Sequence, residues 1–380
     1  MKRFAEMVLD GHPDKFCDIV ADAVLGEAVR RDPAALGQIE VSVFSDRLWV
    51  NGYIATALRS GPDIRAVVRR VGRAIGYVPG NYINVNRYRI TSTVCLQRPV
   101  PESLAALPHD QCVAVGWAGY DEKTAFLPPE QFAARRMRDA LVRACGAGGA
   151  LEREGPDGKL ILCMHEEGGM FRLETVGVTL QHRPGTALPL LRARVTMVLQ
   201  RAYGALQRRD PRWIAPWRAV RVTVNPNGPL VAAGSCGDNG QTGRKLAMDY
   251  YGPRVPVGGG ALSGKSVRHV DRAAAYAARR AAIRAVLAGA GECRVTVAYL
   301  PGRANPVGIE CICARPPQDR TAYPTKEEFR FPDFCLPWEP LAVRIAQTAD
   351  GSHFTDTSLP WNRVDGTGGH TSAPKGGILQ

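Results

Sequence analysis

The sequence contains no apolar run long enough to cross a membrane and no signal-peptide core, because its N-terminus leads directly into the polar segment Asp10-Gly-His-Pro-Asp-Lys15. We therefore expect no membrane partner and a cytoplasmic location. The ten cysteines are scattered, and no Cys-x-x-Cys pair occurs. The closest pair, Cys311 and Cys313, lies in an alternating, strand-like run. This spacing argues against a zinc site and a disulfide framework, and favours reduced, buried thiols.

Acidic residues are the scarcer charged class, with 36 Asp and Glu against 49 Lys and Arg and a net charge of +13. The arginines are spread along predicted helices and are not gathered into a tail or stripe: Arg69, Arg70, Arg135, Arg136, Arg279 and Arg280. Solvated helix faces explain this distribution, so we expect no nucleic-acid partner. A nucleic-acid-binding module remains an alternative that would require strongly salt-dependent binding.

Hydrophobic periodicity predicts both helices and paired strands in each third of the chain. Helices are expected over residues 13–30, 64–75, 130–143, 188–206 and 267–287. Strands are expected over residues 39–43, 48–50, 89–96, 159–164, 171–180, 220–224, 293–299 and 307–313. Because strand pairs and helices recur together, the predicted class is α+β, with mostly antiparallel sheets that are covered by helices on one face.

At 380 residues the chain is long enough for two or three domains. We divide it into an N-terminal subdomain (1–98), a loop or linker (99–109), a central subdomain (110–219) and a C-terminal subdomain (220–364). The remaining residues, 365–380, are rich in Gly, Thr and Ser, and a flexible tail is expected there.

One segment is rich in glycine: Gly258-Gly-Gly-Ala-Leu-Ser-Gly-Lys265-Ser266. Its glycines would allow the backbone to approach an anion such as phosphate closely. Its last eight residues satisfy the P-loop pattern. Two prolines in the preceding segment, at 253 and 256, argue against the buried strand that a P-loop requires. A structural glycine turn without a ligand is a further alternative.

Four short segments each place a cation beside glycine or proline and include or adjoin an aspartate: residues 10–15, 156–159, 234–245 and 258–271. Together they suggest a single site in which cations surround a highly charged anion while two aspartates, Asp14 and Asp271, hold magnesium through oxygen ligands. The cationic residues of this set are His12, Lys159, Arg244, Lys245 and Lys265.

These motifs resemble the signature of the S-adenosylmethionine synthetase (methionine adenosyltransferase) family, over a span from about Glu6 to Trp361. The segments that carry the resemblance are Gly11-His-Pro-Asp-Lys15, Asn225-Pro-Asn-Gly228, Gly240-Gln-Thr-Gly-Arg-Lys245, residues 258–265 and Val270-Asp-Arg272. The resemblance implies three similar α+β subdomains around a pseudo-threefold axis. It also implies a homodimer, or a tetramer built from dimers, with active sites between subunits.

The reaction that the resemblance implies is attack of the sulfur of L-methionine on the ribose C5′ of ATP. Tripolyphosphate leaves and is hydrolysed to phosphate and diphosphate, with two Mg²⁺ and a K⁺ as cofactors. By this resemblance His12 would assist the leaving oxygen, and Asp14 and Asp271 would bind Mg²⁺. Lys159, Arg244, Lys245 and Lys265 would hold the phosphate chain.

The same resemblance assigns the remaining contacts. Glu40 would bind K⁺, with a surface strand carboxylate as the alternative interpretation. The nucleotide would lie along Asp157, Leu230, Asp238 and Ala261. The methionine would contact Tyr53, Gln97, Asp110, Asp238 and His269.

Several of these positions depart from the family pattern. Tyr53 stands where a glutamate is usual, His269 where a lysine is usual, and Leu230 where an aromatic residue stacks on adenine. The changes fall in the methionine and adenine set, whereas the phosphate set is complete. Three hypotheses follow: a divergent methionine adenosyltransferase, a related enzyme for another thioether or nucleotide, and a non-catalytic regulatory homologue.

Overall fold

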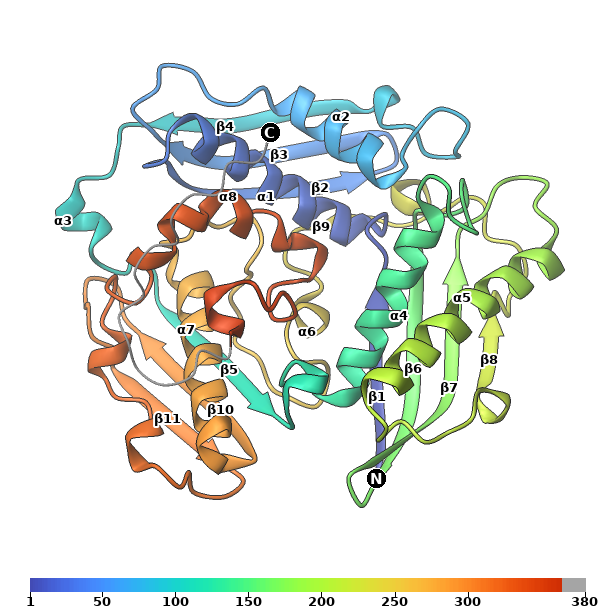
Figure 1. The fold of residues 1–380 in the computed structure, drawn as a ribbon. Helices are drawn as coiled ribbons and strands as arrows, with labels where there is room; N and C mark the ends of the chain where they lie inside the picture. The colour runs from blue at the N-terminus through green and yellow to red at the C-terminus, as the bar shows by residue number, and fades with distance from the viewer. Residues whose placement is uncertain (364–380) are drawn as a thin grey trace, which may run out of the picture.

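The computed structural model describes residues 1–363, and these residues form three β-sheets, each covered on one face by helices (Figure 1). The chain is therefore an α+β protein, as the sequence predicts. The tail predicted over residues 365–380 lies outside the described residues. Within residues 1–363, no helix has the length and apolar character needed to span a membrane.

The first sheet has the strand order β4-β3-β2-β9 and lies against helices α1 (Pro13–Arg31) and α2 (Ile64–Ile75). Its strands are β2 (Leu36–Phe44), β3 (Arg47–Ala55), β4 (Arg89–Gln97) and β9 (Gly240–Gln241). Strands β2 and β3 form the predicted antiparallel hairpin, and β4 runs parallel to β3. Alternate residues of β2 are buried against the helices, which explains the period of two in its sequence.

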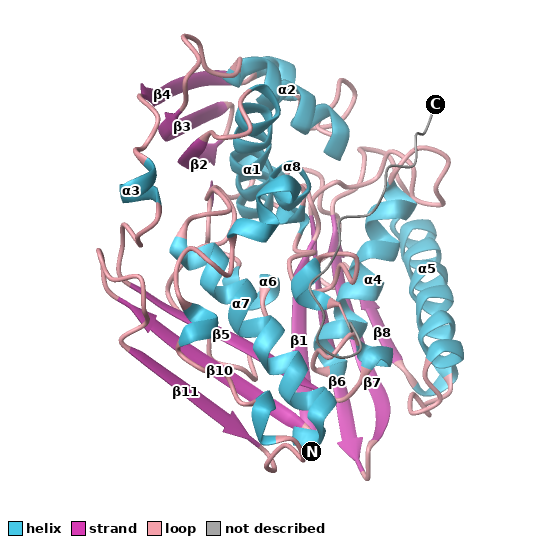
Figure 2. Ribbon diagram, turned by 60° about the vertical axis from the view of Figure 1, so that its left-hand side comes forward, coloured by secondary structure: helices cyan, strands magenta, loops and turns pink. Residues whose placement is uncertain are grey.

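The second sheet has the order β1-β6-β7-β8 and the third the order β11-β10-β5. Helices α4 (Pro129–Cys145) and α5 (Leu188–Arg209) accompany the second sheet, and α7 (Val270–Ala285) packs on the third (Figure 2). The strands are β1 (Lys2–Val8), β5 (Cys112–Gly119), β6 (Gly158–Glu167), β7 (Met170–Leu180), β8 (Arg221–Val224), β10 (Glu292–Tyr299) and β11 (Gly308–Cys313). The short helices are α3 (Glu102–Ala105), α6 (Leu246–Asp249) and α8 (Ala342–Ile345).

Every sheet takes a strand from a distant part of the chain. Strand β1 pairs with β6, β5 pairs with β10, and β9 pairs with β2. None of these three strands, β1, β5 and β9, was predicted from the sequence. In β5 nearly every residue is buried, so its sequence lacks the alternation of a half-exposed strand. The subdomain bounds remain a proposal, since the strands that complete the sheets cross them.

Helix α7 begins three residues later than predicted. The side chain of His269 accepts a hydrogen bond from the backbone N–H of Asp271 and so acts as the N-cap. Helix α1 begins in the same way, with His12 as its N-cap and Pro13 in its first turn. Both helices thus place a histidine and an aspartate at a helix N-terminus.

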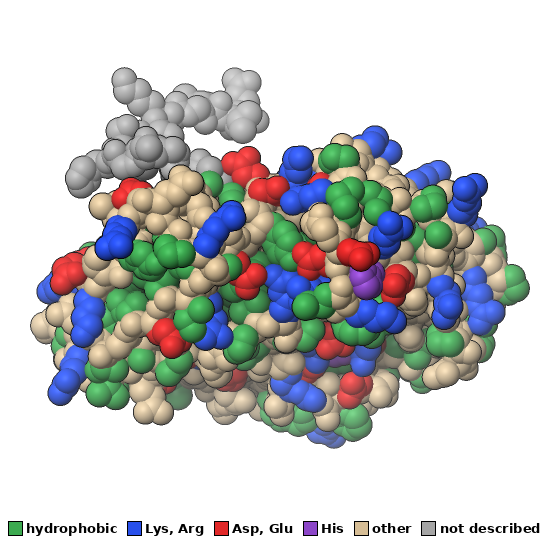
Figure 3. Space-filling view, turned by 90° about the horizontal axis from the view of Figure 1, so that it is seen from below, with side chains coloured by type: hydrophobic (Ala, Val, Ile, Leu, Met, Phe, Trp, Pro, Cys, Tyr) green, Lys and Arg blue, Asp and Glu red, His purple; other side chains and the backbone are tan. Residues whose placement is uncertain are grey.

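Basic side chains are spread between acidic and hydrophobic ones on the face drawn in Figure 3. On that face they do not merge into one continuous positive surface. The absence of a nucleic-acid partner and the cytoplasmic location stay predictions.

Candidate functional site

A row of buried aspartates on helix α1 holds two loops of the C-terminal third. Asp14, Asp18 and Asp22 are four residues apart, so they lie on one face of the helix, and each is almost fully buried. Each carboxylate accepts a hydrogen bond from a loop backbone N–H, at 2.9, 2.9 and 2.8 Å respectively: Gln241, Gly243 and Gly264. The segments with the predicted phosphate-binding cations are therefore fixed against α1.

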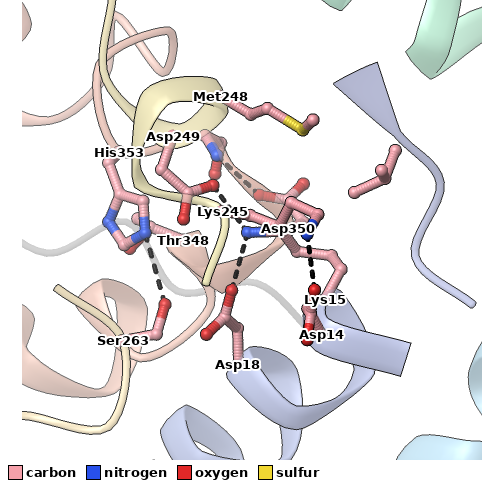
Figure 4. Close-up of polar contacts among 12 residues, drawn as sticks. Asp14, Lys15, Asp18, Lys245, Met248, Asp249, Ser263, Thr348, Asp350 and His353 are labelled. Carbon is pink, nitrogen blue, oxygen red and sulfur yellow. Dashed lines mark hydrogen bonds and ion pairs between the residues drawn. The ribbon is translucent and has the colours of Figure 1, made fainter. Parts of the chain in front are cut away.

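The first functional centre lies at the N-terminus of α1. Lys245 places its Nζ 2.5 Å from Oδ2 of Asp14 (Figure 4). Arg244 places a guanidinium nitrogen 3.6 Å from the other carboxylate oxygen of Asp14. Burial alone would raise the pKa of Asp14. The hydrogen bonds from Lys245 and the Gln241 backbone outweigh it, so the pKa is lowered and the carboxylate stays charged.

A second centre repeats this arrangement at the N-terminus of α7. Lys265 places its Nζ 2.5 Å from Oδ2 of Asp271. In both centres the histidine two residues earlier has its Nδ1 3.9 Å from the aspartate Oδ2, as measured for His12 with Asp14 and for His269 with Asp271. The departure from the family pattern at position 269 thus makes the two centres alike, each with a histidine, an aspartate and a lysine.

Both histidines are held in the neutral state. Burial, reinforced by the charge of Lys245, lowers the pKa of His12 to about 4. Burial and Lys265 lower the pKa of His269 to about 4 in the same way. Because Nδ1 of each ring accepts a backbone hydrogen bond, the single proton of the neutral ring resides on Nε2. Each histidine can therefore donate one hydrogen bond without carrying a charge.

Further predicted residues gather around the first centre. Lys159 and Asp238 are close enough to His12 for their charges to act on it. Lys159, Arg244 and Lys245 line one cavity of about 220 Å³. A larger cavity of about 820 Å³ is lined by residues of α1, α2 and α4 and contains none of these cations. Cavity size alone therefore does not identify the site.

Asp157 presents a buried carboxylate that is only partly satisfied. Its Oδ2 accepts a hydrogen bond of 2.7 Å from the backbone N–H of Gly234. Its Oδ1 is buried and has no hydrogen-bond partner among residues 1–363. Burial raises the pKa of Asp157 to about 6, against the lowering effects of the Gly234 N–H and Lys159. A buried oxygen of this kind is suited to accept a hydrogen bond from a ligand hydroxyl or amino group.

The raised pKa of Asp157 predicts a pH-dependent loss of stability. Between its ordinary value of 3.8 and about 6, the folded protein binds a proton at Asp157 that the unfolded chain does not. The free energy of unfolding should therefore fall as pH rises through this window. Urea unfolding of wild type and Asp157→Asn at several pH values should show the variant gaining about 1–3 kcal/mol relative to wild type between pH 4 and 7. Asp333→Asn, an exposed control, should show no such trend, and a constant difference for Asp157→Asn would contradict the assignment.

The glycine-rich segment is not a P-loop. The described residues 250–257 before it form turns and not a strand, and helix α7 begins only at Val270, four residues after Ser266. A Cβ on Gly260 would lie 2.3 Å from Cγ of Asp271. Gly264 has a φ of +80°, and a Cβ there would lie 2.1 Å from the carbonyl oxygen of Ile39 on β2. The glycines thus allow this segment to pass between β2 and α7 and to position Lys265.

Asp110, His269 and Asp271 form a donor set that could hold a cation. Their ligand atoms all lie within 4.8 Å of one another, and Asp110 is exposed. Carboxylate oxygens are the ligands that Mg²⁺ prefers, and Asp14 offers the same chemistry in the first centre. The donors present at both centres therefore fit magnesium.

Two residues predicted for the methionine are not bonded to either centre, although Gln38 on β2 pairs through its backbone with both Tyr53 and Lys265. Tyr53 and Gln97 are on neighbouring strands β3 and β4. Within residues 1–363, no hydrogen bond or ion pair links either side chain to His12, Lys245 or Lys265. Tyr53 is half-buried, and burial raises the pKa of its hydroxyl group.

Two other predicted residues, Glu40 and Ala261, lie near the segments that carry the cations. Glu40 is near enough to Lys265 for that charge to act on it, although burial raises the pKa of its carboxyl group. Ala261 contacts the loop of residues 240–245, because a Cβ added to Gly243 would lie 2.8 Å from its methyl group. Leu230 is fixed through its backbone, whose N–H donates to Nε2 of His182 at 3.1 Å.

Sequence reasoning missed the buried charges that support the two centres. Lys15 lies between Asp18 and Asp249 at 2.9 and 2.6 Å (Figure 4), and Arg272 binds Asp22 through both guanidinium nitrogens at 2.8 Å. The signal was available, because three aspartates spaced four residues apart within a helix of mainly apolar neighbours indicate a shared polar partner.

Comparisons with known proteins match most of the chain. Residues 3–99 match the N-terminal domain of S-adenosylmethionine synthetase, and residues 232–363 match its C-terminal domain. The chain is 32% identical over 387 residues to S-adenosylmethionine synthase 1 of Rhodopseudomonas palustris (strain BisB18), covering 96% of both chains. It is 31% identical over 412 residues to S-adenosylmethionine synthase of Desulforudis audaxviator, covering 96% of this chain and 98% of the relative. It is 34% identical over 339 residues to S-adenosylmethionine synthase 1 of Rhodospirillum rubrum, covering 86% of this chain and 85% of the relative.

Proposed function

The chain belongs to the S-adenosylmethionine synthetase family, and from this premise we propose that it is a methionine adenosyltransferase. It would convert ATP, L-methionine and water into S-adenosylmethionine, phosphate and diphosphate. The observation that carries this proposal is the pair of centres in which Lys245 and Lys265 each lie 2.5 Å from an aspartate beside a neutral histidine.

The cations would act on the leaving group. As the methionine sulfur attacks C5′, the bond to the tripolyphosphate oxygen breaks and negative charge develops on that oxygen. Lys159, Arg244 and Lys245 already face one cavity, so their charges are in place before the reaction begins. Charges fixed in advance stabilise the transition state because no reorganisation is needed. Lys265 would hold the other end of the phosphate chain.

His12 would donate a hydrogen bond to the departing oxygen. Its proton lies on Nε2 because Nδ1 accepts from the Asp14 N–H, and burial and Lys245 keep the ring neutral. A neutral donor can stabilise the growing charge without competing with the lysines for the same oxygen atoms.

Asp14 and Asp271 would hold two Mg²⁺ ions, and Glu40 would provide a carboxylate ligand for K⁺. Magnesium, when bound, would neutralise part of the phosphate charge. The lysines that pair with Asp14 and Asp271 would then turn to the phosphate oxygens. Asp157 would accept a hydrogen bond from the nucleoside through its unpaired Oδ1, with Leu230, Asp238 and Ala261 along the nucleotide.

A second copy of the chain would complete the site. The sheet faces opposite the helices expose large apolar side chains on all three sheets: Phe4, Ile161, Phe44, Trp49, Val113 and Ile312. Such a surface favours association. Tyr53 lies on this outer face of the first sheet and Gln97 is exposed on its edge strand β4, so a homodimer, alone or within a tetramer, would bring both to the partner's phosphate site. Asp110, Asp238 and His269 would then contribute the other methionine contacts.

A related substrate is the second candidate, because Tyr53 replaces the carboxylate that usually pairs with the methionine ammonium group. Another thioether or nucleotide would then be used with the same phosphate chemistry. A purely regulatory homologue is less well supported, since a protein that does not turn over ATP would not need two complete centres.

Turnover by the purified full-length chain tests both candidates. The protein is incubated with ATP, Mg²⁺ and K⁺, with and without L-methionine, and the sulfonium product is followed by mass together with phosphate. We expect one sulfonium product per phosphate and a clear acceleration by methionine. Phosphate release that methionine does not accelerate would refute methionine as the acceptor, and a panel of thioethers would then identify the substrate. Absence of any nucleotide turnover would favour the regulatory homologue.

A further inference from the structure

Three cysteines on the third sheet form a cluster that the sequence did not reveal. Cys293 lies on β10, and Cys311 and Cys313 lie on β11. The antiparallel register pairs Cys293 with Cys313, so alternation along both strands places all three side chains on the same face. The Sγ atoms of Cys293 and Cys311 are 3.5 Å apart, and those of Cys311 and Cys313 are 3.8 Å apart. All three sulfur atoms lie within 4.8 Å of one another.

These separations suit a shared metal ion better than a disulfide. A zinc–sulfur bond of about 2.3 Å implies sulfur atoms about 3.8 Å apart around a tetrahedral ion. A disulfide requires a sulfur–sulfur distance of about 2.05 Å, so one pair would have to approach by a further ångström or more. The sulfur–sulfur distances thus already match those around a bound zinc ion, although all three cysteines are free thiols.

The surroundings of the cluster provide an entry route for an ion and a cation beside Cys311. Cys293 is fully buried, and Cys311 and Cys313 are partly exposed at the edge strand, which leaves a route for an ion to enter. Arg284, near the end of α7, is close enough for its charge to act on Cys311. Its Nη2 donates to Glu328, but its buried Nε has no partner among residues 1–363. A nearby cation stabilises the net negative charge of three thiolates around a divalent or monovalent ion.

We propose that Cys293, Cys311 and Cys313 bind a soft, thiophilic metal ion, of the class of Zn²⁺ or Cu⁺, through three thiolate sulfurs. Binding would release the three thiol protons to solvent and form three metal–sulfur bonds, with no change in oxidation state. Solvent would supply the fourth ligand of Zn²⁺, whereas Cu⁺ accepts three sulfurs. The site is distinct from the magnesium centres, because its ligands are sulfur and come from different strands. The ion would join edge strand β11 to β10 and stabilise the third sheet.

Metal binding to the full-length chain tests this proposal. The protein is purified under reducing conditions, stripped with a chelator and titrated with Zn²⁺ alone, and bound zinc and reactive thiols are counted. We expect one tightly bound ion that protects three thiols at once and raises the Tm. Cys311→Ser and Cys313→Ser should each weaken zinc binding by more than about a hundredfold. Cys163→Ser, a partly exposed thiol on β6, is the matched control and should bind zinc as wild type does.

Thermal unfolding of the zinc-free variants distinguishes loss of a ligand from loss of the fold. Equal zinc binding by wild type and Cys311→Ser would overturn the proposal, as would the absence of thiol protection in a folded wild type. A disulfide between any two of these cysteines in the reduced-purified protein would also overturn it. Titration with Cu⁺ in parallel then shows which ion of the class binds more tightly.

Discussion

Lys245→Ala is expected to lower kcat for S-adenosylmethionine formation by about a hundredfold or more, equivalent to about 3 kcal/mol of transition-state stabilisation. The Lys245 ammonium group borders the cavity that Lys159 and Arg244 also line, and it lies 2.5 Å from the Asp14 carboxylate. Its removal would leave the developing charge on tripolyphosphate with one fewer fixed cation. It would also deprive Asp14 of the hydrogen bond that keeps its pKa low.

Kinetic measurements with matched variants check this expectation. Lys326→Ala removes an exposed lysine from another part of the chain and should leave kcat unchanged. Lys245→Arg keeps the positive charge but changes its shape, so it should retain more activity than Lys245→Ala. Thermal unfolding of each variant shows whether the fold is preserved. A folded Lys245→Ala enzyme with nearly wild-type kcat would remove Lys245 from the proposed mechanism.

Local patterns were sufficient to predict the elements that carry the phosphate site. Helix α1 was expected over residues 13–30 and spans 13–31, and helix α2 spans the predicted residues 64–75. The features that predict these helices are proline, aspartate and apolar residues at helical spacing. These residues lie close together in the sequence, so a local pattern is enough to identify each helix. The two centres also formed around predicted residues, because each centre begins with a histidine and an aspartate at one helix N-terminus.

Interactions between distant segments were not predictable in this way. Strand β5 is buried on both faces from Ala114 onward and carries a glycine at position 116, where a Cβ would lie 2.0 Å from the backbone of α7. Its identity as a strand depends on pairing with β10, almost two hundred residues later. The cysteine cluster has the same origin, because counting spacings along the chain could not show that the β10–β11 register brings Cys293 to Cys313.

Asp22→Ala should destabilise the protein by about 3–5 kcal/mol, the cost of leaving one partner of a buried ion pair uncompensated. Asp22 and Arg272 are both fully buried and joined by two hydrogen bonds of 2.8 Å. Burial raises the pKa of Asp22 despite this pair, which indicates how strongly the interior disfavours an isolated charge. The substitution would also leave the backbone N–H of Gly264 without its acceptor.

Denaturant unfolding of Asp22→Ala measures the effect, with Asp333→Ala as the control. Asp333 pairs with Arg330 at 2.7 Å on the surface, where an ion pair contributes no more than about 1 kcal/mol. If the two variants lose similar stability, the buried pair does not support the fold as argued. The double variant Asp22→Ala, Arg272→Met separates the causes, since it removes the stranded charge and should recover part of the loss.

The same pair should link stability to activity, because it fixes the loop that carries Lys265. Asp22 holds Gly264, and Arg272 donates to the carbonyl oxygen of Lys265 at 2.7 Å. The double variant would recover part of the stability without restoring either contact to this loop. We therefore expect the kcat of the double variant to stay below that of wild type even where unfolding measurements show that it is folded. This result would show that the buried charges on α1 position the phosphate site as well as stabilise the fold.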